Sequence, residues 1–182
     1  MPWIPTFSAQ FIKPLLQQTV ALIQRDQADA IAYVNPDLQA IQEFHFGRGA
    51  RTAMPWLAIS GDGPQFIRDD DLEYRKGVCV ISLDLDVGDF NQETAQFTAN
   101  DYIRVLDEII SSAGPSPALQ DWTTALPISQ EAVPSGTTIP PAVGTVKDVI
   151  VLSHRYTAVR ADDYPAPILR ATLNFEIHLI EG

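Results

Sequence analysis

The residues whose spacing comes closest to a metal site are three aspartates at the end of an apolar run. Asp84 and Asp86 are spaced like the first and third positions of a calcium-binding loop, whose oxygen ligands suit a hard cation, and Asp89 follows Gly88 in the same cluster. The pattern then departs from such a loop, because Ala95 stands where a bidentate Glu is required. The acidic face of a strand explains the same residues, and we expect no metal or other cofactor.

The histidines do not complete a catalytic or metal-binding pattern. His45, His154 and His178 are far apart in the chain, and no HExxH or CxxC spacing accompanies them. Ser153 precedes His154, but no GxSxG turn presents it as a nucleophile. We therefore expect a protein that is not an enzyme. The rival hypothesis is a small metal-assisted hydrolase that joins the first two of these aspartates to His154 or His178.

An alternating strand is expected to position the aspartates. Between residues 79 and 87 apolar side chains alternate with Val80, Ser82, Asp84 and Asp86, which predicts one buried face and one polar face. The single cysteine, Cys79, lies on the apolar side and has no partner for an internal disulfide. We expect it to be a small buried hydrophobe.

A helix should follow this strand, because the apolar spacing changes from two to three and four. Its apolar stripe is predicted to contain Phe97, Tyr102, Ile103, Leu106, Ile109 and Ile110. Thr98 and Asp101 resemble an N-terminal capping box, and Gly114 with Pro115 forms a stop signal.

Apolar patterns predict the other elements in the same way. A helix covers residues 7–23 and can continue to residue 34, a strand covers 54–60, and two final strands cover 149–160 and 168–180. We expect the 54–60 strand to pair with the 79–87 strand. Leu173 and Phe175 should face the core.

The order of these elements predicts an α+β fold in one domain, residues 1–182. We expect a mostly antiparallel sheet of about four or more strands with two main helices packed on one face. Residues 1–6 form an N-terminal arm, and residues 115–148 form a long Pro-rich loop or insertion.

The charge balance excludes one large class of function. With 23 acidic and 12 basic residues, the formal net charge is -11, and a protein that grips duplex DNA needs clustered Lys and Arg instead. The sequence shows no membrane-length apolar run and no signal peptide pattern. We expect no membrane partner and synthesis in the cytoplasm.

Large aromatic rings in polar, loop-like surroundings are candidates for contacts with other subunits or partners. They are Trp3, Phe44, Phe46 and Trp122, with Arg48 and Arg51 as forked donors. Residues 44–51 allow three interpretations: an ordinary flexible loop, a site for an acidic partner, or a subunit contact in which scarce basic groups meet a neighbour's acidic face. Each ring could equally belong to the local core.

The order and details of these elements resemble the tail terminator (tail completion or neck) family of tailed bacteriophages. The resemblance is carried by the helix 7–23, the strands MPWLAIS and GVCVISLDLDV, the helix TANDYIRVLDEII and the final strand pair at 149–180. It implies a structural virion protein that assembles as a ring, a hexamer in that family, at the head-proximal end of the tail tube. Such a ring terminates tube polymerisation and joins the tail to the neck.

The resemblance also implies partners and a site. The partners would be further copies of the chain, the tail tube protein, a neck or connector protein and a sheath protein, in the tail or neck of a virion. DNA would pass through without specific binding, because acidic side chains repel phosphates. Candidates for the acidic channel lining are Asp69, Asp70, Asp71, Asp84, Asp86, Asp89 and Glu176. The alternatives are another phage neck or head-tail connector protein, the hydrolase, and a monomeric ligand-binding module with the Pro-rich loop as its lid.

Overall fold

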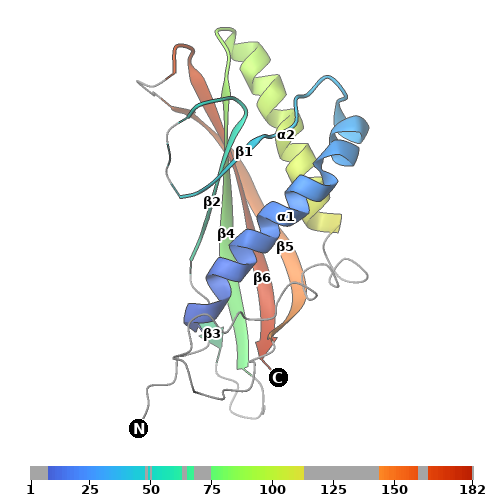
Figure 1. The fold of residues 1–182 in the computed structure, drawn as a ribbon, viewed down its shortest axis with the longest axis vertical. Coiled ribbons are helices and arrows are strands. Elements are labelled where there is room, and N and C mark those ends of the chain that lie inside the picture. Colours follow the sequence, from blue (N-terminus) through green and yellow to red (C-terminus); the bar gives the residue numbers. More distant parts are fainter. Residues whose placement is uncertain are drawn as a thin grey trace.

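The computed structural model describes residues 8–47, 49, 51–62, 65–67, 75–112, 144–159 and 164–181. In this part of the chain two helices and six strands form an α+β fold, as predicted (Figure 1). In chain order they are α1 (Ser8–Val34), β1 (Glu43–Phe46), β2 (Trp56–Gly61), β3 (Gln65–Ile67), β4 (Arg75–Gly88), α2 (Gln92–Ser112), β5 (Gly144–Val159) and β6 (Ile168–Glu181). The arm at residues 1–6 and residues 115–143 of the Pro-rich segment lie outside the described residues, while residues 144–148, predicted as the end of that loop, belong to β5 instead.

The sheet is built around the long antiparallel pair of β4 and β6. Its order is β1-β2-β4-β6-β5, and β3 continues along the edge of β4 that β2 also occupies. The β4–β6 ladder runs from Arg75 opposite Glu181 to Gly88 opposite Ile168. Both the expected pairing of the strands near residues 57 and 83 and that of the two final strands are confirmed. All pairs are antiparallel except β1 with β2.

The alternation in the sequence becomes two different faces of this sheet. Leu83 and Leu85 of β4 lie in register with Leu173 and Ala171 of β6, and all four side chains are fully buried. Helix α2 packs against β4, β5 and β6, while α1 packs on α2 and β2. Figure 1 shows both helices against the sheet, which confirms the prediction that they cover one face.

Helix α2 begins at Gln92, seven residues earlier than the capping box at Thr98 suggested, so that prediction is wrong. The side chain of Asn91 caps it instead, because its Oδ1 accepts the N–H groups of Glu93 at 3.0 Å and Thr94 at 3.4 Å. The buried stripe holds the predicted residues from Tyr102 onward, but Phe97 is 59% exposed.

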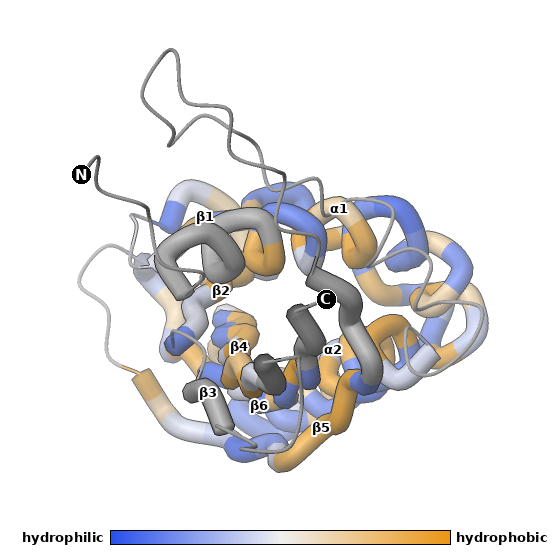
Figure 2. The backbone as a smooth tube through the Cα atoms, turned by 90° about the horizontal axis from the view of Figure 1, so that it is seen from below, coloured by the Kyte–Doolittle hydropathy of each residue, from blue (hydrophilic) through white to orange (hydrophobic). Residues whose placement is uncertain are grey.

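Helix α1 is continuous to Val34, which confirms the predicted continuation beyond residue 23. Its end is fixed to α2, since the side-chain amide of Asn35 donates to Asp101 Oδ2 at 2.8 Å. Neither described helix is long and apolar enough to span a membrane. The end-on view in Figure 2 shows α1 and α2 together on one side of the strands.

Candidate functional site

The polar face of the sheet carries side chains that hydrogen-bond from strand to strand. Ser82 Oγ donates to Asn174 Oδ1 at 2.6 Å, and Asn174 Nδ2 donates to Ser153 Oγ at 3.2 Å. One row further along, Thr172 Oγ1 donates to Asp84 Oδ1 at 2.6 Å. Along each strand these polar residues alternate with the buried apolar ones, so they lie on the face away from the core. Their hydrogen bonds link β4, β6 and β5.

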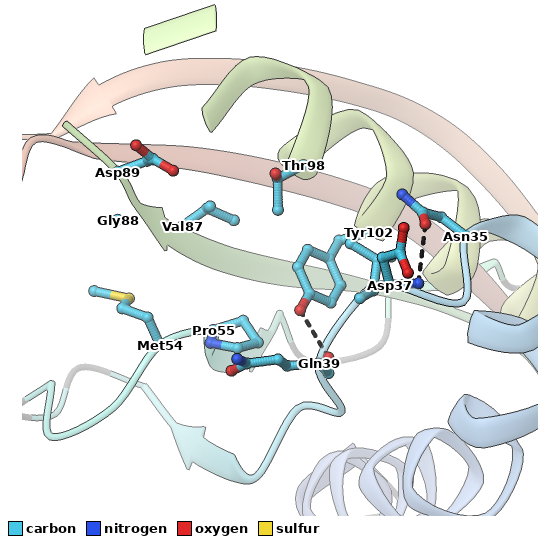
Figure 3. Close-up of a pocket in the computed structure, with 11 residues that line it drawn as sticks. Asn35, Asp37, Gln39, Met54, Pro55, Val87, Gly88, Asp89, Thr98 and Tyr102 are labelled. Carbon is cyan, nitrogen blue, oxygen red and sulfur yellow. Dashed lines mark hydrogen bonds between the residues drawn. The ribbon is translucent and has the colours of Figure 1, made fainter. Parts of the chain in front are cut away.

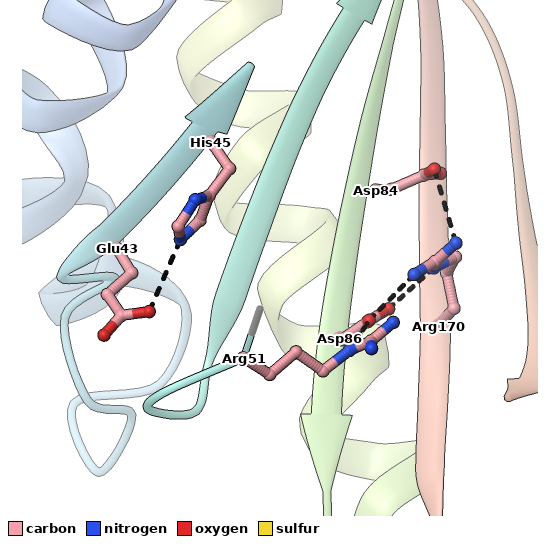
Figure 4. A network of polar contacts seen from close by, with 6 residues as sticks. All are labelled: Glu43, His45, Arg51, Asp84, Asp86 and Arg170. Carbon is pink, nitrogen blue, oxygen red and sulfur yellow. Dashed lines mark hydrogen bonds and ion pairs between the residues drawn. The ribbon is translucent and has the colours of Figure 1, made fainter. Parts of the chain in front are cut away.

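At the end of this face two arginines enclose one aspartate. Asp86 has no exposed surface. Arg170 donates from Nε to its Oδ1 at 2.7 Å and from Nη2 to its Oδ2 at 2.8 Å, while Arg51 Nε donates to Oδ2 at 2.7 Å (Figure 4). The hydrogen bonds to Asp86 raise the pKa of Arg170, so its charge is fixed at physiological pH. Asp84 adds a weaker contact to Arg170, at 3.7 Å.

Arg51 belongs to the connection between β1 and β2, which folds over this end of the polar face. Its guanidinium carbon lies 5.2 Å from the centroid of the Trp56 ring, and His45 stacks on the same ring at 5.0 Å. Gly49 passes so close that a Cβ there would lie 2.9 Å from His45 Nδ1. The indole Nε1 of Trp56 is buried without a hydrogen-bond partner among the described residues.

Glu43 and Thr52 complete the connection on its exposed side. The hydroxyl of Thr52 donates to Glu43 Oε1, and His45 Nε2 lies 3.4 Å from Glu43 Oε2. The hydrogen bond from Thr52 lowers the pKa of Glu43, which keeps this carboxylate charged near neutral pH.

The residues predicted to contact other subunits or partners occupy different positions in the structure. Residues 44–46 are not a loop but part of β1, which pairs in parallel with β2. Phe44 packs against the core, Phe46 is 56% exposed, and Arg51 binds Asp86 of its own chain. Trp3, Arg48 and Trp122 lie outside the described residues.

The predicted channel residues are also divided. Asp84 and Glu176 lie on the polar face with side chains 31% and 29% exposed, and Glu176 sits 3.2 Å from His178. Asp89 lies instead in the turn before α2, where its Oδ1 accepts the N–H of Asn91. Asp86 is buried beneath its two arginines and presents no surface to a channel, so we remove it from the lining. Asp69, Asp70 and Asp71 lie outside the described residues.

A pocket of about 290 Å³ opens where the end of β4 meets α2 and the segment after α1. Asp37 and Asp89 contribute carboxylates, and the hydroxyl of Tyr102 donates to the carbonyl of Gln39 at 2.7 Å (Figure 3). Burial raises the pKa of Tyr102 to about 12, so the phenol stays protonated and already has an acceptor. No nucleophile and base meet among the described residues that line this pocket.

The parts of the rival hydrolase are not assembled. His154 lies in register with Leu173, on the opposite face of the sheet from the aspartates. His178 lies on the same face as the aspartates but is paired with Glu176 at 3.2 Å. The described residues contain no group of three or more His, Cys, Asp or Glu that could hold a metal. Cys79 is fully buried, as predicted, and burial raises its pKa to about 12. A buried thiol of this kind is unreactive.

Sequence reasoning missed Arg170 and Trp56 as neighbours of Asp86, because no local pattern marks either residue. The place of Arg170 beside Asp86 follows from the β4–β6 register, which sets the two residues opposite each other. The position of Trp56 opposite Asp86 follows from the β2–β4 register.

Comparison with known proteins shows a likeness in fold and none in sequence. No protein-family model matches the chain, and no curated protein matches it. Among solved structures, the fold is similar to that of a chain in the "Virion of native gene transfer agent (GTA) particle", with a TM-score of 0.51. The match covers 97% of this chain and 100% of that chain, at 11% sequence identity.

Proposed function

We propose that this protein is a structural subunit of a phage-like virion, of the tail terminator type. It assembles as a homo-oligomeric ring, a hexamer, at the head-proximal end of the tail tube, stops tube polymerisation and joins the tail to the neck. The observation that carries the proposal is the likeness in fold to a chain of a gene transfer agent virion over nearly the whole length of both chains. Its partners are the tail tube protein, a neck protein and a sheath protein.

The polar face of the sheet supports a role beside DNA. Two cations of this face, Arg51 and Arg170, are already bound to Asp86, so they have little tendency to bind phosphate, while Arg155 lies apart from them on the edge strand β5. Asp84 and Glu176 add partly exposed carboxylates to this face, and the chain as a whole carries a net charge of -11. A lining of this kind gives DNA few sites for non-specific binding. In this proposal Asp84 and Glu176 line the channel, and Asp89 lies near its end.

The test is light scattering on the purified protein behind a sizing column, followed by negative-stain imaging with cognate tail tubes. We expect rings in solution or density at one end of the tubes. A protein that forms rings but binds a neck component and ignores tubes would be another neck or connector protein, to which the same fold likeness also leads. A monomer that does neither would contradict both assignments.

A further inference from the structure

In the described part of the sheet, the path β1-β2-β4-β6-β5 ends in two strands that each pair on one side, and β3, which lies off this path, also pairs only with β4. β5, which has 16 residues, pairs with β6, and β1, which has 4, pairs with β2. They lie on opposite sides of the β4–β6 pair (Figure 2). The outward N–H and C=O groups of an edge strand form a template for another strand, and natural proteins usually cover or blunt such edges.

Both edges also expose large apolar side chains. Ile150 and Leu152 on β5 are 41% and 48% exposed, and Phe46 on β1 is 56% exposed. Leu152 falls at the register shift between Val151 and Ser153, so it has no partner on β6. Beyond this shift β5 pairs regularly with β6 from Ser153 up to Val159, so this run can accept three residues of β1, and the fourth meets Leu152 at the shift.

The strand directions suit a contact between the two edges. β1 runs parallel to β2, and the successive antiparallel pairs β2–β4, β4–β6 and β6–β5 make β5 antiparallel to β1. A second copy related by rotation about an axis along the strands therefore brings its β5 beside β1 in the antiparallel arrangement, which is slightly more stable per residue than the parallel one.

The side chains favour one register for this contact. Glu43 on β1 and Arg155 on β5 both lie on the polar face, since Glu43 is in register with Trp56 and Arg155 with Thr172. Arg155 is exposed and makes no ion pair with another described residue. With Glu43 opposite Arg155, antiparallel pairing places Phe46 beside Val151 and Leu152, so opposite charges meet at one end and apolar groups at the other.

We propose that copies of this chain join edge to edge, with β1 of one subunit pairing antiparallel with β5 of the next. The contact is heterologous, because each subunit uses two different patches, and repetition of such a contact closes a ring when the rotation allows it. The inference rests on the proposed ring function and names the surfaces that form the ring. The sheets of neighbouring subunits then become one continuous sheet.

A charge placed on β5 tests whether this strand forms the subunit contact. In Leu152→Lys we expect the concentration needed for half-maximal ring assembly to rise by about tenfold or more, because the apolar contact is lost and a Lys blunts the edge. Phe97→Lys is the matched control, since Phe97 is similarly exposed but lies on α2, and it should assemble like the parent protein. Loss of rings in the Phe97 variant alone would assign the contact to the helical face and overturn the proposal. Circular dichroism of each variant checks that it is folded.

Cross-linking tests the pairing independently of any effect on stability. The double variant Phe46→Cys with Leu152→Cys, treated with a short bismaleimide, should give a ladder of covalent oligomers up to the ring size. The parent protein is the background control, because its Cys79 is fully buried. Each single variant should stay uncross-linked.

The outcomes separate this inference from the proposed function. Rings that form normally but yield no ladder would overturn the β1–β5 contact and leave the ring function standing. Dimers from Leu152→Cys alone would show that two β5 edges pair about a two-fold axis instead. A parent protein that forms no ring, alone or on tubes, would contradict the function itself.

Discussion

At the scale of single residues, the most consequential side chain is that of Asp86. It joins three segments that are far apart in the chain, because Arg51 from the β1–β2 connection and Arg170 from β6 both donate to it. A fully buried carboxylate is costly unless donors satisfy it, and these two guanidinium groups do so. These three residues form the Asp86 cluster. Through Arg51, the cluster holds the β1–β2 connection against the sheet, and β1 therefore lies at the sheet's edge.

Asp86→Asn should therefore lower the free energy of unfolding by about 3 kcal/mol, because two largely buried arginines lose their counter-charge. Asp84→Asn is the matched control. Its side chain is partly exposed and 3.7 Å from Arg170, so the expected cost is about 1 kcal/mol or less. Urea unfolding at pH 7 measures both values. Equal costs for the two variants would contradict the role given to Asp86.

At the scale of elements, strand β4 and helix α2 follow their sequence patterns, but local hydrogen bonds decide where α2 begins. Asn91 supplies the cap that starts α2, and Asp89 accepts the N–H of Asn91 to form the preceding turn. The helix is then long enough for Ala95 and Ala99 to reach the core. A capping residue thus decides how much of an amphipathic segment becomes helical.

Asn91→Ala should destabilise the protein by about 1 kcal/mol, because the N–H groups of Glu93 and Thr94 lose their acceptor. Thr98→Ala, at the cap position that the sequence suggested, should cost nothing or stabilise slightly, since Ala is the better residue inside a helix. Thermal unfolding followed by circular dichroism gives the comparison. A larger loss at Thr98 than at Asn91 would reverse the assignment of the cap.

The core face of β6 gives a second test at this scale. Phe175 is fully buried and lies opposite Ile81 and Val151, so Phe175→Ala should cost about 3–5 kcal/mol through lost burial and the cavity left behind. Thr157→Ala, at an exposed position of β5, serves as control and should change stability by about 0.5 kcal/mol or less. Chemical denaturation measures the pair, and a stable Phe175 variant would refute the core assignment.

At the scale of the whole molecule, the fold separates two kinds of surface. One sheet face packs under the helices, and the other carries hydrogen-bonded polar side chains and the Asp86 cluster. Groups that the first face buries must stay neutral, because charge is poorly solvated there. Stability should therefore depend on pH where those groups would otherwise ionise.

Burial raises the pKa of Cys79 and of Tyr102 to about 12, from ordinary values of 9.0 and 10.0. Below about pH 8 both groups are protonated in the folded and the unfolded chain. As the pH rises further, the unfolded chain releases protons that the folded chain retains, so the free energy of unfolding should fall between about pH 9 and 12. Urea titrations across this range measure the slope. The double variant Cys79→Ala with Tyr102→Phe should show a shallower decline, and an unchanged slope would contradict the assignment.

The sequence by itself determined the layers of this protein. Apolar residues alternate strictly in β4 and β6 and recur every three or four residues in α2. Such spacing shows which face of a segment avoids water, and it can be recognised within the segment itself. The burial of Cys79, Leu173 and Phe175 could be predicted for the same reason.

Tertiary structure alone decided which polar residues meet. Alternation assigned Asp84 and Asp86 to the same polar face, yet one is partly exposed and the other is buried under Arg51 and Arg170. The difference arises because strand register and the path of the β1–β2 connection bring distant donors to one position, and no local pattern encodes such pairing. The short parallel strand β1 was missed for the same reason, since its pairing with β2 depends on that connection. The two ends of the described sheet that we propose as the subunit contact likewise follow from the order of the strands, which only the folded sheet displays.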